Sequence, residues 1–126
     1  MLSIIEKVLI LKRIDIFTST PDPILAEVAE LLEEIELPTA FKLFEKGESG
    51  RCMYMVVDGH IRIHNDGHTL TDVGPGEVFG EMALLDSAPR VASAMAVEDT
   101  LLLKLDQGSR ALFTDYELFV ACCICR

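Results

Sequence analysis

The first part of the chain carries hydrophobic residues at helical spacing. Residues 3–13 show this pattern, and they are predicted to form a helix. Ser3 and Glu6 have the form of a capping box, which is typical of a helix start. Four apolar side chains are expected to share one face of this helix: Ile4, Ile5, Val8 and Leu9.

A second helix is predicted shortly afterwards. Asp22 is expected to cap it, and Pro23 suits its first position. The apolar residues that recur at helical spacing are Ile24, Leu25, Val28, Leu31, Leu32 and Ile35. An acidic set fills the other side and is interpreted as a solvated surface: Glu27, Glu30, Glu33 and Glu34.

After Pro38 the pattern changes to short β-rich pieces separated by glycine: AFKLFEKGESG, CMYMVVDG, HIRIHNDG and TLTDVGPG. Residues 61–64 alternate as a half-buried strand does, and Asn65-Asp66-Gly67 predicts a tight turn after them. Residues 91–97 and 101–105 indicate two more strands. Strands at this regular spacing predict a small antiparallel sandwich or barrel. The final segment, from about residue 107, is predicted to be helical again.

Residues 78–94, VFGEMALLDSAPRVASA, interrupt the β pattern. Residues 81–85 are rich in Met, Ala and Leu, and they predict one or two helical turns inserted between strands, ended by Pro89. The start of such a helix offers free N–H groups to a phosphate, and Gly80 lets the backbone approach a ligand closely.

Two charged residues stand out in this apolar segment. Arg90 can fork onto two phosphate oxygens, whereas Glu81 repels phosphate and suits a sugar hydroxyl. The pair therefore indicates a nucleotide site. The alternative is a Glu81–Arg90 salt bridge that fastens the loop, and the residues alone leave both readings open.

Composition narrows the possible partners. The 126 residues suit one domain, and the net charge of −10 argues against direct nucleic-acid binding and against an anionic membrane surface. A small anion can still bind where local donors outweigh the global charge. The four cysteines are expected to be free thiols in a cytoplasmic protein: Cys52, Cys122, Cys123 and Cys125.

The stretch F-G-E-M-A-L-L-x-x-x-P-R-x-A at residues 79–92 resembles the phosphate-binding cassette of cyclic nucleotide-binding domains. That family includes the catabolite activator protein, regulatory subunits of cyclic-AMP-dependent kinase, and cyclic-nucleotide-gated channels. The likeness extends over nearly the whole chain. Further matching positions are Gly47, Met53-Tyr54, Gly59, Gly76 and Leu103-x-Leu105-Asp106.

The resemblance implies an eight-stranded antiparallel jelly roll with flanking helices. It would divide the chain into N-terminal helices (1–37), a jelly roll (38–106) and a C-terminal helical segment (107–126). It also implies a set of ligand-binding residues: Gly80, Glu81, Met82, Ala83, Arg90, Val91 and Ala92.

In that set, Glu81 would accept the ribose 2′-hydroxyl and Arg90 would pair with the cyclic phosphate. The backbone N–H groups of Ala83 and Val91 would reach phosphate oxygens, and Gly80 would bring main chain close to the ribose. Family members usually carry Ala, Ser or Thr after the arginine, and Val91 is a departure whose bulk is expected to crowd the site. Because valine lacks the threonine hydroxyl that can meet guanine, cyclic AMP is expected to bind more tightly than cyclic GMP.

The sequence favours a cyclic nucleotide sensor. One alternative is a jelly roll that has lost its ligand and serves as an interaction domain, and another is an enzyme. The enzymatic reading is weak. The sequence shows no metal-ligand cluster, and the three histidines (His60, His64 and His68) lie along a predicted hairpin. Neither a cofactor nor a metal is expected.

The effector of such a sensor is absent from this sequence. The chain is therefore expected to be a lone sensor or a domain cut from a larger protein, with a membrane protein among the candidates for that parent. The apolar tail, 113–126, would supply only the beginning of the family's C-terminal helix. It is expected to promote self-association, with a homodimer as the candidate state.

Overall fold

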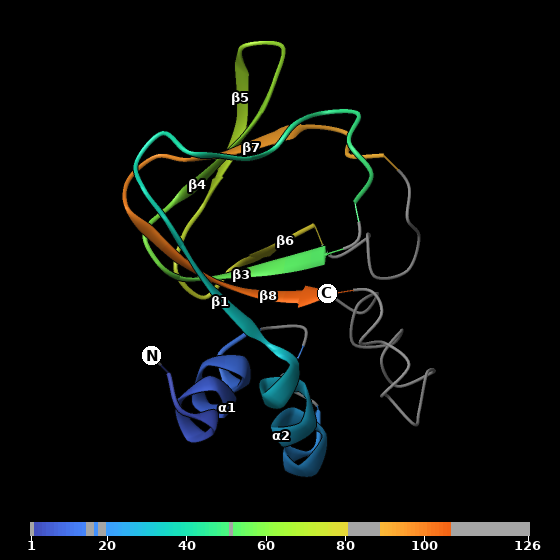
Figure 1. The fold of residues 1–126 in the computed structure, drawn as a ribbon, viewed down its shortest axis with the longest axis vertical. Coiled ribbons are helices and arrows are strands. Elements are labelled where there is room, and N and C mark those ends of the chain that lie inside the picture. The colour runs from blue at the N-terminus through green and yellow to red at the C-terminus, as the bar shows by residue number, and fades with distance from the viewer. Residues whose placement is uncertain (1, 15–16, 18–19, 51, 81–88, 107–126) are drawn as a thin grey trace.

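The structure is a computed structural model that describes residues 2–14, 17, 20–50, 52–80 and 89–106 (Figure 1). Two helices precede a set of eight strands. The elements are α1 (Ile4–Lys12), α2 (Asp22–Leu31), β1 (Glu33–Leu37), β2 (Lys42–Phe44), β3 (Cys52–Asp58), β4 (Ile61–Asn65), β5 (His68–Val73), β6 (Val78–Phe79), β7 (Ser93–Ala96) and β8 (Thr100–Asp106).

The strands form two four-stranded sheets, in the orders β1-β8-β3-β6 and β2-β7-β4-β5. All neighbouring strands are antiparallel. The expected eight-stranded antiparallel jelly roll is therefore confirmed. None of the described helices is long and apolar enough to span a membrane.

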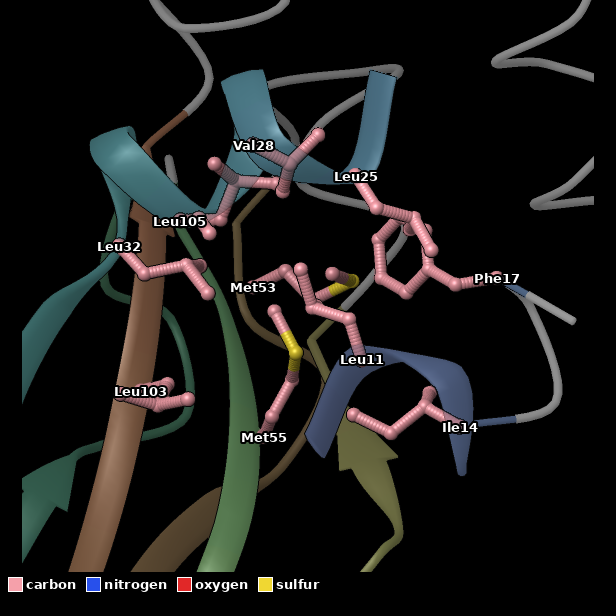
Figure 2. Packing of buried hydrophobic residues seen from close by; sticks show 11 residues of the cluster. Leu11, Ile14, Phe17, Leu25, Val28, Leu32, Met53, Met55, Leu103 and Leu105 are labelled. Carbon is pink, nitrogen blue, oxygen red and sulfur yellow. The ribbon is translucent and has the colours of Figure 1, made fainter. Parts of the chain in front are cut away.

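The strand β3 is buried on both faces, because helices cover one face of its sheet and the second sheet covers the other. Met53 and Met55 point to the helices, where they meet Leu103 and Leu105 of β8 (Figure 2). The alternate residues of β3 lie in the core between the sheets: Cys52, Tyr54 and Val56. A strand covered on both sides reads as a continuous apolar run, which explains the sequence CMYMVV.

Helix α1 begins as predicted. Ser3 Oγ accepts the Glu6 N–H, and the Glu6 carboxylate accepts the Ser3 N–H, so the capping box is present. The predicted apolar face is mostly exposed, since Ile5 is 73% and Leu9 56% exposed, whereas Val8 packs against the core and Leu11 is fully buried. Apolar residues occur on two sides of this helix, and the pattern alone does not decide which side meets the sheet.

The second helix ends earlier than predicted. It stops at Leu31, and β1 follows at Glu33–Leu37, so the expectation of a helix reaching Ile35 is wrong. Ile35 instead pairs with Leu102 in the β1–β8 ladder, which places the first strand of the sheet before residue 38. The segment E-E-I-E-L continues the helical spacing of α2 and also alternates as a strand does. Its pairing with β8 stabilises the strand.

The start of α2 also differs from the prediction. Pro21 occupies the cap position and Asp22 is the first helical residue, so Asp22 makes no side-chain cap bond. Its carboxylate lies 3.2 Å from Lys12 Nζ at the end of α1. Asp22 thus links the two helices by an exposed ion pair and adds negative charge to the first turn of α2.

The predicted turn at the tip of the β4–β5 hairpin is confirmed. Asp66 and Gly67 both have positive φ, at 50° and 82°, as a two-residue hairpin turn requires. The two strands predicted at 91–97 and 101–105 correspond to β7 and β8, although β7 begins only at Ser93. The predicted C-terminal helical segment, 107–126, lies outside the described residues.

Gly59, in the turn between β3 and β4, offers a test of the packing. Its φ is +95°, and a Cβ there would lie 2.5 Å from Thr100 Oγ1 and 2.7 Å from the Asp99 carbonyl oxygen. Gly59→Ala should lower the free energy of unfolding by about 1–2 kcal/mol for the left-handed backbone and by roughly 1–3 kcal/mol more for the overlap. Gly67→Ala is the matched control, because Gly67 has φ +82° with open space around it. Urea unfolding measures both variants, and equal losses would contradict the packing argument.

Candidate cyclic nucleotide site

The site is built around Arg90, which is held by the chain connecting β2 to β3. The Arg90 N–H donates to the Glu48 carbonyl oxygen at 2.7 Å, and the Gly47 N–H donates to the Arg90 carbonyl oxygen at 2.8 Å. An isolated antiparallel bridge joins Ser49 to Pro89 beside them. These contacts fix the main chain at Arg90 just before β7 begins.

The guanidinium of Arg90 has its own partners. Its Nη2 donates to the Cys52 carbonyl oxygen at 2.8 Å. Its Cζ lies 4.2 Å from the centroid of the Phe44 ring and 5.9 Å from that of Tyr54. Both distances are within the range of cation–π attraction, and the shorter one places the charge directly over Phe44.

Two glycines close on the guanidinium. A Cβ at Gly50 would lie 2.7 Å from Arg90 Nε, and a Cβ at Gly80 would lie 2.7 Å from Arg90 Nη1 and 3.1 Å from the Cys52 carbonyl oxygen. Gly80 also has φ +76°, which side chains rarely tolerate. A side chain at either position would displace the Arg90 guanidinium. The space between Phe44, Cys52 and these two glycines is called the Arg90 slot below.

Three of the described side chains beside Arg90 are uncharged at neutral pH: Phe44, Tyr54 and Cys52. The carboxylate of Asp106 is close by, since it accepts the Cys52 Sγ–H at 3.5 Å. Burial raises the pKa of Tyr54 and also that of the Cys52 thiol, which therefore stay protonated at pH 7. The ion pairs formed among the described residues include Arg62 but not Arg90. Within the described part of the chain, the Arg90 charge is stabilised by a ring and a carbonyl, and such a guanidinium is suited to hold an anion.

The family is identified by comparison with known proteins. A family model described as "Cyclic nucleotide-binding domain" matches residues 35–113, which is more than half of the chain. The chain belongs to the cyclic nucleotide-binding domain family. The matched residues include the strands β2–β8 and the Arg90 slot.

Individual relatives agree with this assignment. The chain is 48% identical over 73 residues to the cyclic AMP receptor protein of Thermus thermophilus, which covers 54% of this chain and 34% of the relative. Its fold is similar to that of the N-terminal domain of a Streptomyces coelicolor transcriptional regulator, with a TM-score of 0.81, 30% identity, and coverage of 90% of this chain and 85% of that one. The regulatory domain of Toxoplasma gondii protein kinase A, solved with cyclic AMP, gives a TM-score of 0.78 at 30% identity, with coverage of 84% and 42%.

The chain is shorter than these full-length relatives. It spans 34% of the Thermus protein and 47% of a cyclic-AMP-activated transcriptional regulator from Mycobacterium tuberculosis. The cyclic nucleotide-binding domain is thus the part that they share with this chain.

The structure brings together some of the site residues predicted from the cassette. Gly80 lies against the Arg90 guanidinium, and Ala92 is buried beyond it. Val91 is 84% exposed, so its side chain is not packed against the described part of the domain. The other predicted residues lie outside the described residues: Glu81, Met82 and Ala83. The question of a Glu81–Arg90 salt bridge falls there too.

Sequence reasoning missed the parts that position Arg90. Phe44 and Gly50 lie about 40 residues before it, and no local pattern connects them to the cassette. Cys52 acts through its backbone carbonyl, which every residue type possesses. The one available signal was the glycine-bounded segment K-G-E-S-G at 46–50, which indicates a turn but does not identify its partner.

Two of the three histidines lie on the predicted hairpin, whereas His60 lies before it, in the turn between β3 and β4. His60 Nδ1 lies 2.9 Å from a Glu98 carboxylate oxygen, in an exposed pair. His64 and His68 lie on β4 and β5. Among the residues that the structure describes, no group of three or more His, Cys, Asp or Glu side chains is placed to hold a metal ion.

The buried Tyr54 gives a pH prediction. Its pKa is higher in the folded than in the unfolded chain, so its contribution to stability is fully present below the unfolded pKa of about 10 and is lost as the pH rises through the folded pKa. The free energy of unfolding of the wild type should therefore fall relative to that of Tyr54→Phe above about pH 10. Urea unfolding between pH 8 and 11 measures this difference, and parallel curves over that range would contradict it.

Proposed function

We propose that this domain binds a cyclic mononucleotide, with cyclic AMP preferred to cyclic GMP, and acts as the sensor part of a larger regulatory protein. The observation that carries the proposal is the Arg90 slot inside a cassette-like sequence. An arginine fixed by a ring and a carbonyl, with glycines on two sides, is prepared to receive a compact anion next to exposed main chain. Relatives that carry the same domain are named as cyclic AMP receptors and as kinase regulatory subunits.

Each cassette residue has a proposed role. Arg90 pairs with the cyclic phosphate, and the left-handed backbone of Gly80 allows the ribose to approach. Glu81 accepts the 2′-hydroxyl, and the N–H groups of Ala83 and Val91 complete the phosphate site. The ligand then combines one charge-assisted pair with several backbone hydrogen bonds.

The proposed effector lies outside this sequence. The relatives include a transcriptional regulator, kinase regulatory subunits and a potassium channel. In each of them the match covers only part of the protein, so one sensor domain accompanies different effectors. The net charge of −10 makes direct DNA binding by this chain unfavourable.

The first test removes the arginine. Arg90→Ala eliminates a charge-assisted contact worth about 1.5–3 kcal/mol, so cyclic AMP affinity should fall at least tenfold. Arg62→Ala on β4 is the matched control, because Arg62 forms an exposed ion pair with Asp72 and its loss should leave the affinity unchanged. Titration calorimetry on protein shown to be free of nucleotide measures both. Failure of the wild type to bind millimolar cyclic AMP or cyclic GMP would favour the nucleotide-independent interaction domain.

The second test concerns the base. Val91 is exposed and offers methyl groups where a guanine amino group needs an acceptor. The nearby Ser93 hydroxyl accepts the Lys46 backbone N–H at 2.9 Å and keeps a second lone pair, so Ser93→Ala is tested beside the wild type. Leaving the guanine amino group unmet costs about 1–3 kcal/mol, so cyclic AMP should bind roughly tenfold or more tightly than cyclic GMP.

Val91→Thr should narrow this gap by improving cyclic GMP binding. Val97→Thr is the control, since Val97 is an exposed valine beyond the other end of β7. Both nucleotides are competed against one fluorescent analogue in each variant. Equal wild-type affinities, or a preference for cyclic GMP, would overturn the assignment of base choice to Val91.

A further inference from the structure

Three aromatic rings lie beside the Arg90 slot. Phe44 stands at the end of β2, with its ring centroid 6.2 Å from those of both Tyr54 and Phe79. Tyr54 and Phe79 stack on each other at 5.3 Å with an interplanar angle of 19°. Phe44 is only partly buried, whereas the other two are buried. It is therefore the outermost ring of the cluster, and the Arg90 charge lies on it.

We infer that Phe44 is a positioning residue for anion binding, which holds the Arg90 guanidinium in its binding orientation before a ligand arrives. The inference rests on the proposed function and names a residue outside the cassette. An arginine side chain loses much rotamer freedom when it is ordered, and ordering it in advance removes that cost from the binding step.

The geometry explains how a ring can position the group without blocking it. A guanidinium is planar, and its five N–H donors point outward in that plane. Phe44 contacts the group with a ring, which offers no acceptor that would compete for those donors. The Cys52 carbonyl takes one donor of Nη2 and fixes the rotation of the plane. A carboxylate in place of the ring would instead occupy two donors and neutralise the charge.

Phe44, rather than Tyr54, carries this role. The Cζ of Arg90 is 4.2 Å from the Phe44 centroid but 5.9 Å from that of Tyr54, near the limit of the interaction. Tyr54 is also committed to the stack with Phe79 in the core between the sheets. Phe79 contributes no cation–π contact to Arg90 among the described residues and serves as a control.

The first measurement needs no ligand. The Arg90 Nε–H signal is assigned in a ¹⁵N NMR spectrum by its absence from Arg90→Ala. In the wild type it should be shifted upfield by the ring, and Phe44→Leu should abolish that shift. Phe44→Tyr should retain it, since the ring face is kept, and Phe79→Leu should retain most of it. An Arg90 signal that does not move in Phe44→Leu overturns the inference, whether or not a nucleotide binds.

The second measurement is a double-mutant cycle on cyclic AMP affinity. Phe44→Leu should weaken binding about three- to tenfold when Arg90 is present, and Phe44→Tyr should restore it. On the Arg90→Ala background the same substitution should have almost no effect, because there is no guanidinium left to position. An equal loss on both backgrounds would show a purely structural role and overturn the inference. A retained NMR shift with no nucleotide binding by the wild type would refute the proposed function but leave the positioning of Arg90 intact.

Discussion

The described structure depends on the burial of β3 on both faces. Met53 and Met55 pack toward the helices, while Tyr54 and Val56 fill the space between the sheets. A strand enclosed in this way cannot shift without disturbing packing on both sides, since protein interiors are close-packed and resist small displacements. The first residue of the strand, Cys52, supplies the carbonyl that holds Arg90. The position of Arg90 is thus set by a segment that is enclosed on both faces.

The described surroundings of Arg90 stabilise its guanidinium less than a carboxylate would, and they leave its charge free to pair with an anion. Removing a guanidinium from water costs several kcal/mol when the burial is complete, and a carboxylate partner would offset much of that. The described surroundings of Arg90 offset it in smaller amounts, through a hydrogen bond worth about 1.5–3 kcal/mol and a cation–π contact worth about 0.5–2 kcal/mol. The charge is ordered but not neutralised by the described groups, which is the state that an anion-binding residue requires.

The sequence predicted best where the signal was local. The capping box at Ser3 and the Asp66-Gly67 turn depend on neighbouring residues, and both were confirmed. The end of α2 was misjudged because Ile35 fits a helical and an alternating pattern equally well, and the choice depends on pairing with β8, about 65 residues later. The buried side of α1 could not be predicted for the same reason, since a distant partner decides which side is covered.

The same distinction applies to the site. Gly80 and Arg90 lie within one recognisable motif, and the structure brings them together. The groups that orient Arg90 come from other elements: a ring at the end of β2 and a backbone carbonyl at the start of β3. Contacts between remote segments leave no periodic pattern, and a backbone acceptor leaves no residue type to notice. A motif can therefore indicate a candidate binding residue while giving no indication of what holds that residue in place.

The acidity of the chain does not conflict with an anionic ligand. The net charge of −10 is spread over a surface where some carboxylates are already paired, as in the Lys42–Glu45 and Lys104–Glu33 ion pairs. At physiological ionic strength the Debye length is about 8 Å, so exposed charges beyond that distance act weakly on a bound ligand. Arg90 lies within about 6 Å of two uncharged rings and bonds a carbonyl, so its charge stands closer to a ligand in the slot than most of the surface carboxylates do. The global charge slows the approach of an anion and discourages extended polyanions, which contact a wide surface, whereas a single compact phosphate is governed by the slot itself.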